Sequence, residues 1–144
     1  MIEQDTIKLL KECDAGIDMG ITSIGDVLQF VSDTDLKAEL ENSKKEHERL
    51  EGEIASLLDR YNEEGKAPNP MAKGMSWLKT NVKLTIDESD QTVADLITDG
   101  CNMGVKTLSK YLNQYKAADE KSKDITKKLI NAEEKLAFGI RKYL

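Results

Sequence analysis

Apolar residues recur every three or four positions through four long stretches of the chain, which is the pattern of amphipathic helices. The pattern predicts helices over residues 6–31, 35–61, 89–116 and from residue 123 to the C-terminus. No stretch alternates between apolar and polar residues as a half-buried strand does. We therefore predict an all-α fold, in which residues 1–144 form a single domain.

The segments between these helices predict how the helices are connected. Residues 32–35 and 117–122 are short and rich in capping residues, so each joins two antiparallel helices into a hairpin. Residues 62–88 contain both prolines and are long enough to return along a whole helix. We expect an up-down-down-up four-helix bundle of two helical hairpins joined by a long crossover. A short extra helix over residues 71–84, with Trp77, is expected in the crossover.

Residues 13–24 and 97–108 form a faint internal repeat at an offset of 84. The identical pairs are Gly16/Gly100, Met19/Met103 and Gly20/Gly104. Each glycine inside a helix costs about 1 kcal/mol relative to alanine, so a packing reason is expected. We predict two hairpins related by a pseudo-two-fold axis, with the glycine pairs meeting where the first helix crosses the third.

The charge of the chain indicates which classes of partner are expected. The net charge of −6 argues against a nucleic-acid partner. Residues 105–144 carry ten Lys/Arg and five Asp/Glu, a net of +5, whereas the other 104 residues carry −11, so a homo-oligomer is a candidate. No apolar run reaches the roughly 18 residues of a membrane span. Cys13 and Cys101 match no metal spacing. The first residues do not resemble a secretion signal, so a cytoplasmic location is expected.

One polar level is expected in the middle of the bundle. His47, the single histidine, lies on an apolar helical stripe, and reflection through the short turns places Asp18, Asn102 and Glu133 near it. Two interpretations are open for these four residues. Without a metal, they form a hydrogen-bonded polar layer or tilt their side chains out to water; otherwise they hold a metal such as iron or zinc. The polar layer is favoured because a single imidazole without a proper ligand spacing is a poor metal site.

Three short segments carry a resemblance to a known family. They are the Asp-x-Gly-x-x-x-Gly of residues 14–20, the Ser-Asp-Thr-Asp-Leu-Lys of residues 32–37 and the Trp-Leu-Lys of residues 77–79. The chain resembles the ferritin-like superfamily, and within it uncharacterised bacterial ferritin-like proteins. The resemblance implies di-iron ligands, a Glu on the first and third helices and a Glu-x-x-His on the second and fourth. With one histidine, and Lys44 three residues before it, that ligand set is not retained.

These features lead to an expected function. We expect a non-catalytic helical bundle with no cofactor, acting by surface interaction or self-association with a protein partner that the sequence does not identify. The alternative is a metal-binding or redox protein with a reduced ligand set around His47.

Overall fold

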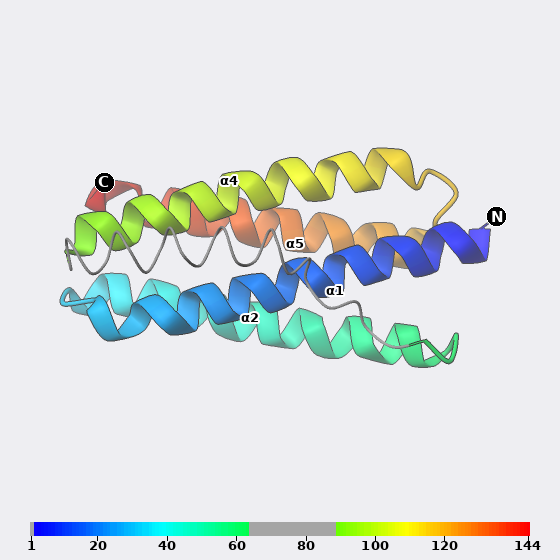
Figure 1. The fold of residues 1–144 in the computed structure, drawn as a ribbon, viewed down its shortest axis with the longest axis horizontal. Coiled ribbons are helices and arrows are strands. Elements are labelled where there is room, and N and C mark those ends of the chain that lie inside the picture. The colour runs from blue at the N-terminus through cyan, green and yellow to red at the C-terminus, as the bar shows by residue number, and fades with distance from the viewer. Residues whose placement is uncertain (1, 64–88) are drawn as a thin grey trace.

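The computed structural model describes residues 2–63 and 89–144, and the ribbon over these ranges is helical (Figure 1). The elements are α1 (Ile2–Val27), η1 (Leu28–Phe30), α2 (Thr34–Asp59), α4 (Asp90–Gln114), α5 (Glu120–Gly139) and η2 (Arg141–Tyr143). No strand occurs within the described ranges, so the all-α class is confirmed. The extra helix predicted around Trp77 lies outside the described residues. None of the described helices has the length and apolar character needed to cross a membrane.

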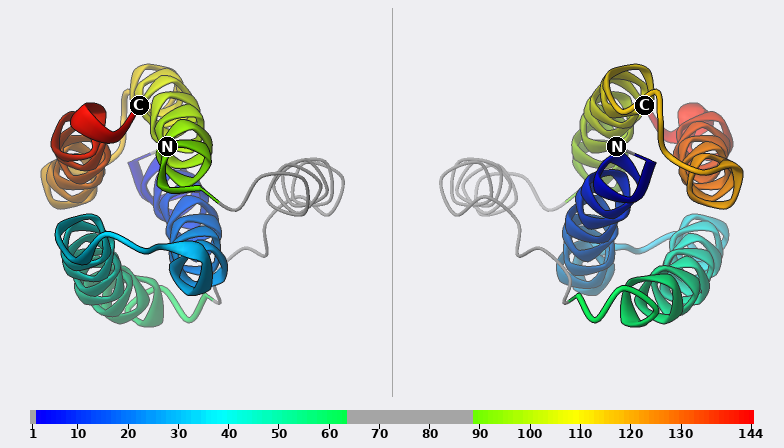
Figure 2. Two further views of the ribbon diagram at one scale, coloured as in Figure 1. Left: turned by 90° about the vertical axis from the view of Figure 1, so that its left-hand side faces the viewer. Right: turned by 90° about the vertical axis from the view of Figure 1, so that its right-hand side faces the viewer.

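The four long helices form two antiparallel hairpins that lie side by side (Figure 2). In the first hairpin α2 follows α1, and in the second α5 follows α4. Between the hairpins, α1 lies next to α4 and α2 lies next to α5. Figure 1 shows that α4 begins at the end of the molecule where α1 ends, so α1 and α5 run in one direction and α2 and α4 in the other.

Three of the helices begin at a capping side chain that the sequence makes recognisable. The carboxylate of Asp33 accepts hydrogen bonds from the first turn of α2, and Ser89 and Asp119 do the same for α4 and α5. Each cap satisfies backbone N–H groups that have no partner within the helix. At Asp119 the cap is also tied to the other hairpin, because its own backbone N–H donates to the hydroxyl of Thr6, at 2.8 Å.

Each hairpin turn is held by a carboxylate from the start of the other hairpin. Asp90, in the first turn of α4, accepts from the backbone N–H groups of Ser32 and Asp33, at 2.8 and 3.0 Å. Asp5, in the first turn of α1, accepts from the backbone N–H of Ala117, at 3.0 Å. Asp90 lies 85 residues after Asp5, and Ala117 lies 85 residues after Ser32. Equivalent contacts at opposite ends of the bundle are expected when two hairpins are related by a pseudo-two-fold axis.

The hydrophobic core is divided into two clusters along the length of the bundle, and each draws on all four helices. The first cluster consists of Leu9, Leu10, Cys13, Ile17, Leu50, Ile54, Leu57, Leu58, Leu108, Ala118, Ile125 and Leu129. The second consists of Ile24, Val27, Leu36, Leu40, Val93, Ile97, Cys101, Leu136 and Ile140. Along every helix, the two clusters are separated by a few residues, and these residues hold the polar level of the bundle.

Candidate functional site

A buried ion pair lies at the level between the two hydrophobic clusters. His47 of α2 has no exposed surface and Glu133 of α5 is 9% exposed. The ring Nε2 of His47 is 2.5 Å from Oε1 of Glu133. Each residue lies 14 positions after the N-cap of its helix, Asp33 for α2 and Asp119 for α5. The two side chains therefore occupy equivalent positions of the two hairpins and meet near the pseudo-two-fold axis.

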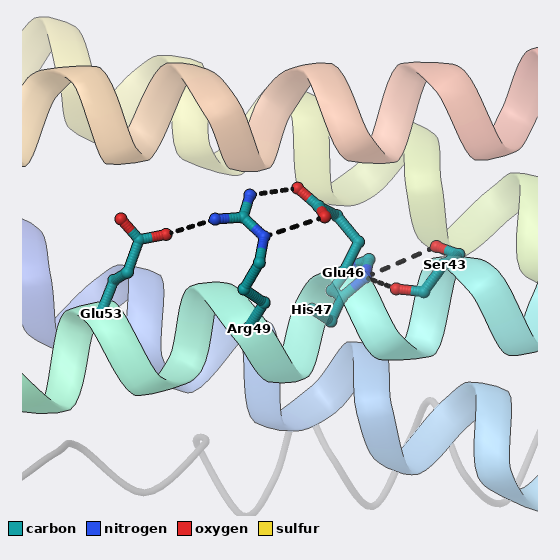
Figure 3. Close-up of polar contacts among 5 residues, drawn as sticks. All are labelled: Ser43, Glu46, His47, Arg49 and Glu53. Carbon is teal, nitrogen blue, oxygen red and sulfur yellow. Dashed lines mark hydrogen bonds and ion pairs between the residues drawn. The ribbon is translucent and has the colours of Figure 1, made fainter.

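The second nitrogen of the His47 ring is also occupied. Its Nδ1 is 2.8 Å from the backbone carbonyl oxygen of Ser43, one helical turn earlier (Figure 3). Both ring nitrogens thus face oxygen acceptors, a carbonyl and a carboxylate. A neutral imidazole has only one N–H, whereas an imidazolium donates from both nitrogens. This arrangement suits an imidazolium paired with a carboxylate.

The surroundings of His47 act on its pKa in opposite directions. Burial, the largest influence, lowers the pKa, because it disfavours the charged ring. The hydrogen bond and negative charge of Glu133, helped by the Ser43 carbonyl and by Glu46, raise it. The raising influences together are greater, so the pKa of His47 lies above its ordinary value of 6.5.

Two glycines of the internal repeat make room for this pair. A Cβ on Gly20 of α1 would lie 3.0 Å from Cδ2 and 3.1 Å from Nε2 of His47. A Cβ on Gly104 of α4 would lie 3.5 Å from Oε2 of Glu133. The prediction that the glycine pairs meet where α1 crosses α4 is therefore wrong. The atoms closest to a Cβ on Gly20 or on Gly104 belong to side chains of α2 and α5. Gly100, which matches Gly16 in the repeat, faces open space.

A thiol completes the polar level. Cys101, one turn before Gly104 on α4, is 3% exposed and lies close enough to Glu133 to be influenced by its carboxylate. Burial and the Glu133 carboxylate raise the pKa of this thiol, so it stays protonated. Sequence reasoning placed Cys101 among core residues and missed this contact, although its spacing of three from Gly104 puts both on one helical face. Cys13 is likewise a buried free thiol, and burial raises its pKa to about 12.

The structure brings together two of the four residues predicted to share this level, His47 and Glu133. Asp18 is partly exposed and lies near Glu51 across the first hairpin, and Asn102 is exposed on α4. The physical reason is the helical phase. Asp18 and Asn102 each lie two positions before the glycine that faces the pair, and two positions turn a helix by about 200°. Asp18 and Asn102 are therefore corrected from members of the level to residues outside it.

The residues of this level do not fit the iron that the resemblance implies. A di-iron centre needs carboxylates from all four helices, but α1 and α4 present Gly20 and Gly104 here. Within residues 2–63 and 89–144, no three His, Cys, Asp or Glu side chains are grouped so that they could hold a metal ion. Both nitrogens of the one imidazole are already hydrogen-bonded. The level is closed by its own side chains.

Comparisons with known proteins add no family to this picture. No protein-family model matches the chain, and no curated protein or solved structure matches it. The geometry of the polar level and the distribution of surface charge are the two features of the molecule that bear on function.

Proposed function

We propose that the chain is a non-catalytic, ferritin-like four-helix bundle of up-down-down-up topology that acts by association through its surface. The observation that carries the proposal is the polar level. The His47 ring is hydrogen-bonded at both nitrogens, to the Ser43 carbonyl and to the buried carboxylate of Glu133. Buried polar groups in folded proteins are usually hydrogen-bonded within the structure, so a histidine ring bonded at both nitrogens favours a structural role for the pair.

The two hairpins differ in charge, and this difference favours a second copy as the partner. Residues 2–63 carry 7 Lys/Arg and 16 Asp/Glu, a net of −9, whereas residues 89–144 carry 10 and 8, a net of +2. The exposed face of α5 includes Lys121, Lys127, Lys128 and Lys135. Opposite charges on two surfaces of one chain attract two copies and orient them at encounter.

Sedimentation velocity of the full chain tests the proposed self-association. In about 0.01 M salt we expect a species heavier than the 16.1 kDa monomer, and in about 1 M salt, where charges are screened, the monomer. The double variant Lys127→Glu/Lys128→Glu should weaken the association. The control Lys37→Glu/Lys45→Glu, on exposed positions of the acidic hairpin, should not. A monomer at both salt concentrations would contradict self-association.

The alternative, a metal-binding or redox protein around His47, requires more than the described level provides. The Nε2 atom would have to leave Glu133 before it could bind a metal, because a lone pair is needed for coordination. We therefore place the function of the chain on its surface, and metal analysis separates the two classes.

A further inference from the structure

We propose that the His47–Glu133 pair is a proton-operated latch between the two hairpins, closed while His47 is an imidazolium and loosened when the ring gives up its proton. The proposal does not depend on self-association. It begins from the position of the pair, which joins α2 of one hairpin to α5 of the other between the two hydrophobic clusters. The hydrogen bonds that Asp5 and Asp90 make between the hairpins lie at the two ends of the bundle.

The latch is sensitive to pH because the His47 ring carries two N–H protons when it is charged and one when it is neutral. Two acceptors, the Ser43 carbonyl and the Glu133 carboxylate, face the two ring nitrogens at 2.8 and 2.5 Å. Loss of one proton leaves a single N–H for two acceptors, and the group that could then donate to Nδ1 is the Ser43 hydroxyl, at 3.5 Å, the outer limit of a hydrogen bond. A buried acceptor without a donor costs free energy. The closed geometry is therefore favoured only while the second proton is present.

The groups around the ring give it little freedom to adapt. On the side of α1, Gly20 lies against the ring and has no side chain that could replace Glu133. On the side of α4, Gly104 lies against Glu133, and the buried thiol of Cys101 is near enough to be influenced by that carboxylate. Because the ring and the carboxylate are confined on these sides, relief after proton loss requires movement of α2 away from α5 or entry of water.

The remaining charged groups near the ring are acidic and favour its proton. Glu46, on the same helix as His47, acts on the ring in the same direction as Glu133. Its carboxylate is held by Arg49, at 2.6 Å, on the exposed side of α2, and Arg49 also binds Glu53 (Figure 3). Lys135 of α5 acts on Glu46. Glu133 is therefore the buried partner that decides the protonation of the ring.

The sign of the pH dependence follows from linkage. The pKa of His47 is raised in the folded chain above its ordinary value of 6.5. The proton therefore contributes its full stabilisation below the unfolded value, and this stabilisation is lost as the pH rises through the folded pKa. The latch opens on the alkaline side.

Proton NMR of the full chain tests the first half of the proposal, because His47 is the single histidine and its ring signals need no assignment by mutation. We expect a midpoint above 6.5. In Glu133→Gln, burial remains without the charge, so the midpoint should fall below 6.5. The matched control Glu46→Gln removes the neighbouring exposed-side carboxylate and should leave the midpoint above 6.5. A wild-type midpoint at or below 6.5 would overturn the proposal.

Amide hydrogen exchange, corrected for its intrinsic pH dependence, tests the second half. Protection over residues 44–50 and 130–136 should fall roughly tenfold or more as the ring loses its proton. This is the fall expected when the closed state carries the usual penalty of an unsatisfied buried acceptor. Protection over residues 6–12, at the end of the bundle, should not change with this midpoint. If the ring titrates and protection at the middle is constant, the pair is no latch. The wild-type measurements decide between these outcomes even if His47→Gln fails to fold. If His47→Gln does fold, its protection over residues 44–50 and 130–136 should show no fall at this midpoint.

Discussion

At Gly20, the missing Cβ leaves the space that the ring of His47 occupies. Gly20→Ala should lower the free energy of unfolding by about 1–2 kcal/mol, because a Cβ at 3.0 Å must displace a ring that is held at both nitrogens. Gly52→Ala is the matched control. A Cβ on Gly52 of α2 would meet no atom within 4 Å, so alanine there should raise stability by about 0.5–1 kcal/mol. Urea unfolding of both variants measures the difference, and equal stabilisation would place Gly20 away from the ring.

The two cysteines should be unreactive in the native chain. Burial raises the pKa of Cys13 to about 12, and burial with Glu133 raises that of Cys101. Since the thiolate is the nucleophile, a thiol-specific reagent should modify neither residue at neutral pH until the chain unfolds. Two thiols per chain should then react in denaturant. Rapid labelling of the native chain would show that one of these side chains is accessible.

At the scale of single residues, the sequence predicts that a polar level exists better than it predicts which residues form it. The apolar stripe of the second helix points to a buried His47, and the short turns bring Glu133 to the same level. The sequence does not distinguish Asp18 from Gly20 as the residue facing His47, because an error of two positions in the register of a hairpin reverses the helical face. The close contact of Gly20 with the ring depends on packing between three helices, which periodicity does not describe.

At the scale of the elements, each hairpin turn depends on the first turn of a helix in the other hairpin. Asp90→Ala and Asp5→Ala each leave backbone N–H groups of a turn without their acceptor, and each should cost about 1 kcal/mol. Asp99→Ala, on the exposed face of α4, is the control and should change stability by less than about 0.5 kcal/mol. The double variant should show additive losses, since the two contacts lie at opposite ends. Thermal unfolding that is unaffected by either single change would contradict these contacts.

The helices predicted from periodicity match the structure most closely at the starts of α2 and α4, whereas α5, capped by Asp119, begins at residue 120 instead of 123. Residues 35 and 89 were expected to begin helices, and α2 and α4 begin at residues 34 and 90 beside Asp33 and Ser89. The first helix begins at residue 2 instead of 6 and ends at residue 27 instead of 31. Its last predicted turn is the 3₁₀ segment η1, whose apolar side chains continue the helical spacing although the backbone tightens.

At the scale of the whole molecule, His47 and Glu133 occupy equivalent positions of the two hairpins. His47→Glu alone places two carboxylates face to face and should cost about 3–5 kcal/mol, as the loss of one partner of a buried pair does. Exchanging both residues, His47→Glu with Glu133→His, should recover most of that loss. Chemical unfolding of the three chains measures the recovery. A doubly exchanged chain no more stable than His47→Glu would mean that the two hairpins are not equivalent at this level.

We propose that the middle of the bundle is closed by its own His47–Glu133 pair and binds no metal. The most direct test is elemental analysis of untagged protein, incubated with ferrous iron or zinc and then freed of unbound metal. The account predicts far less than one metal ion per chain for the wild type, and the same for His47→Gln. Retention of about one ion per wild-type chain, lost in His47→Gln, would contradict it and assign the level around His47 to metal chemistry.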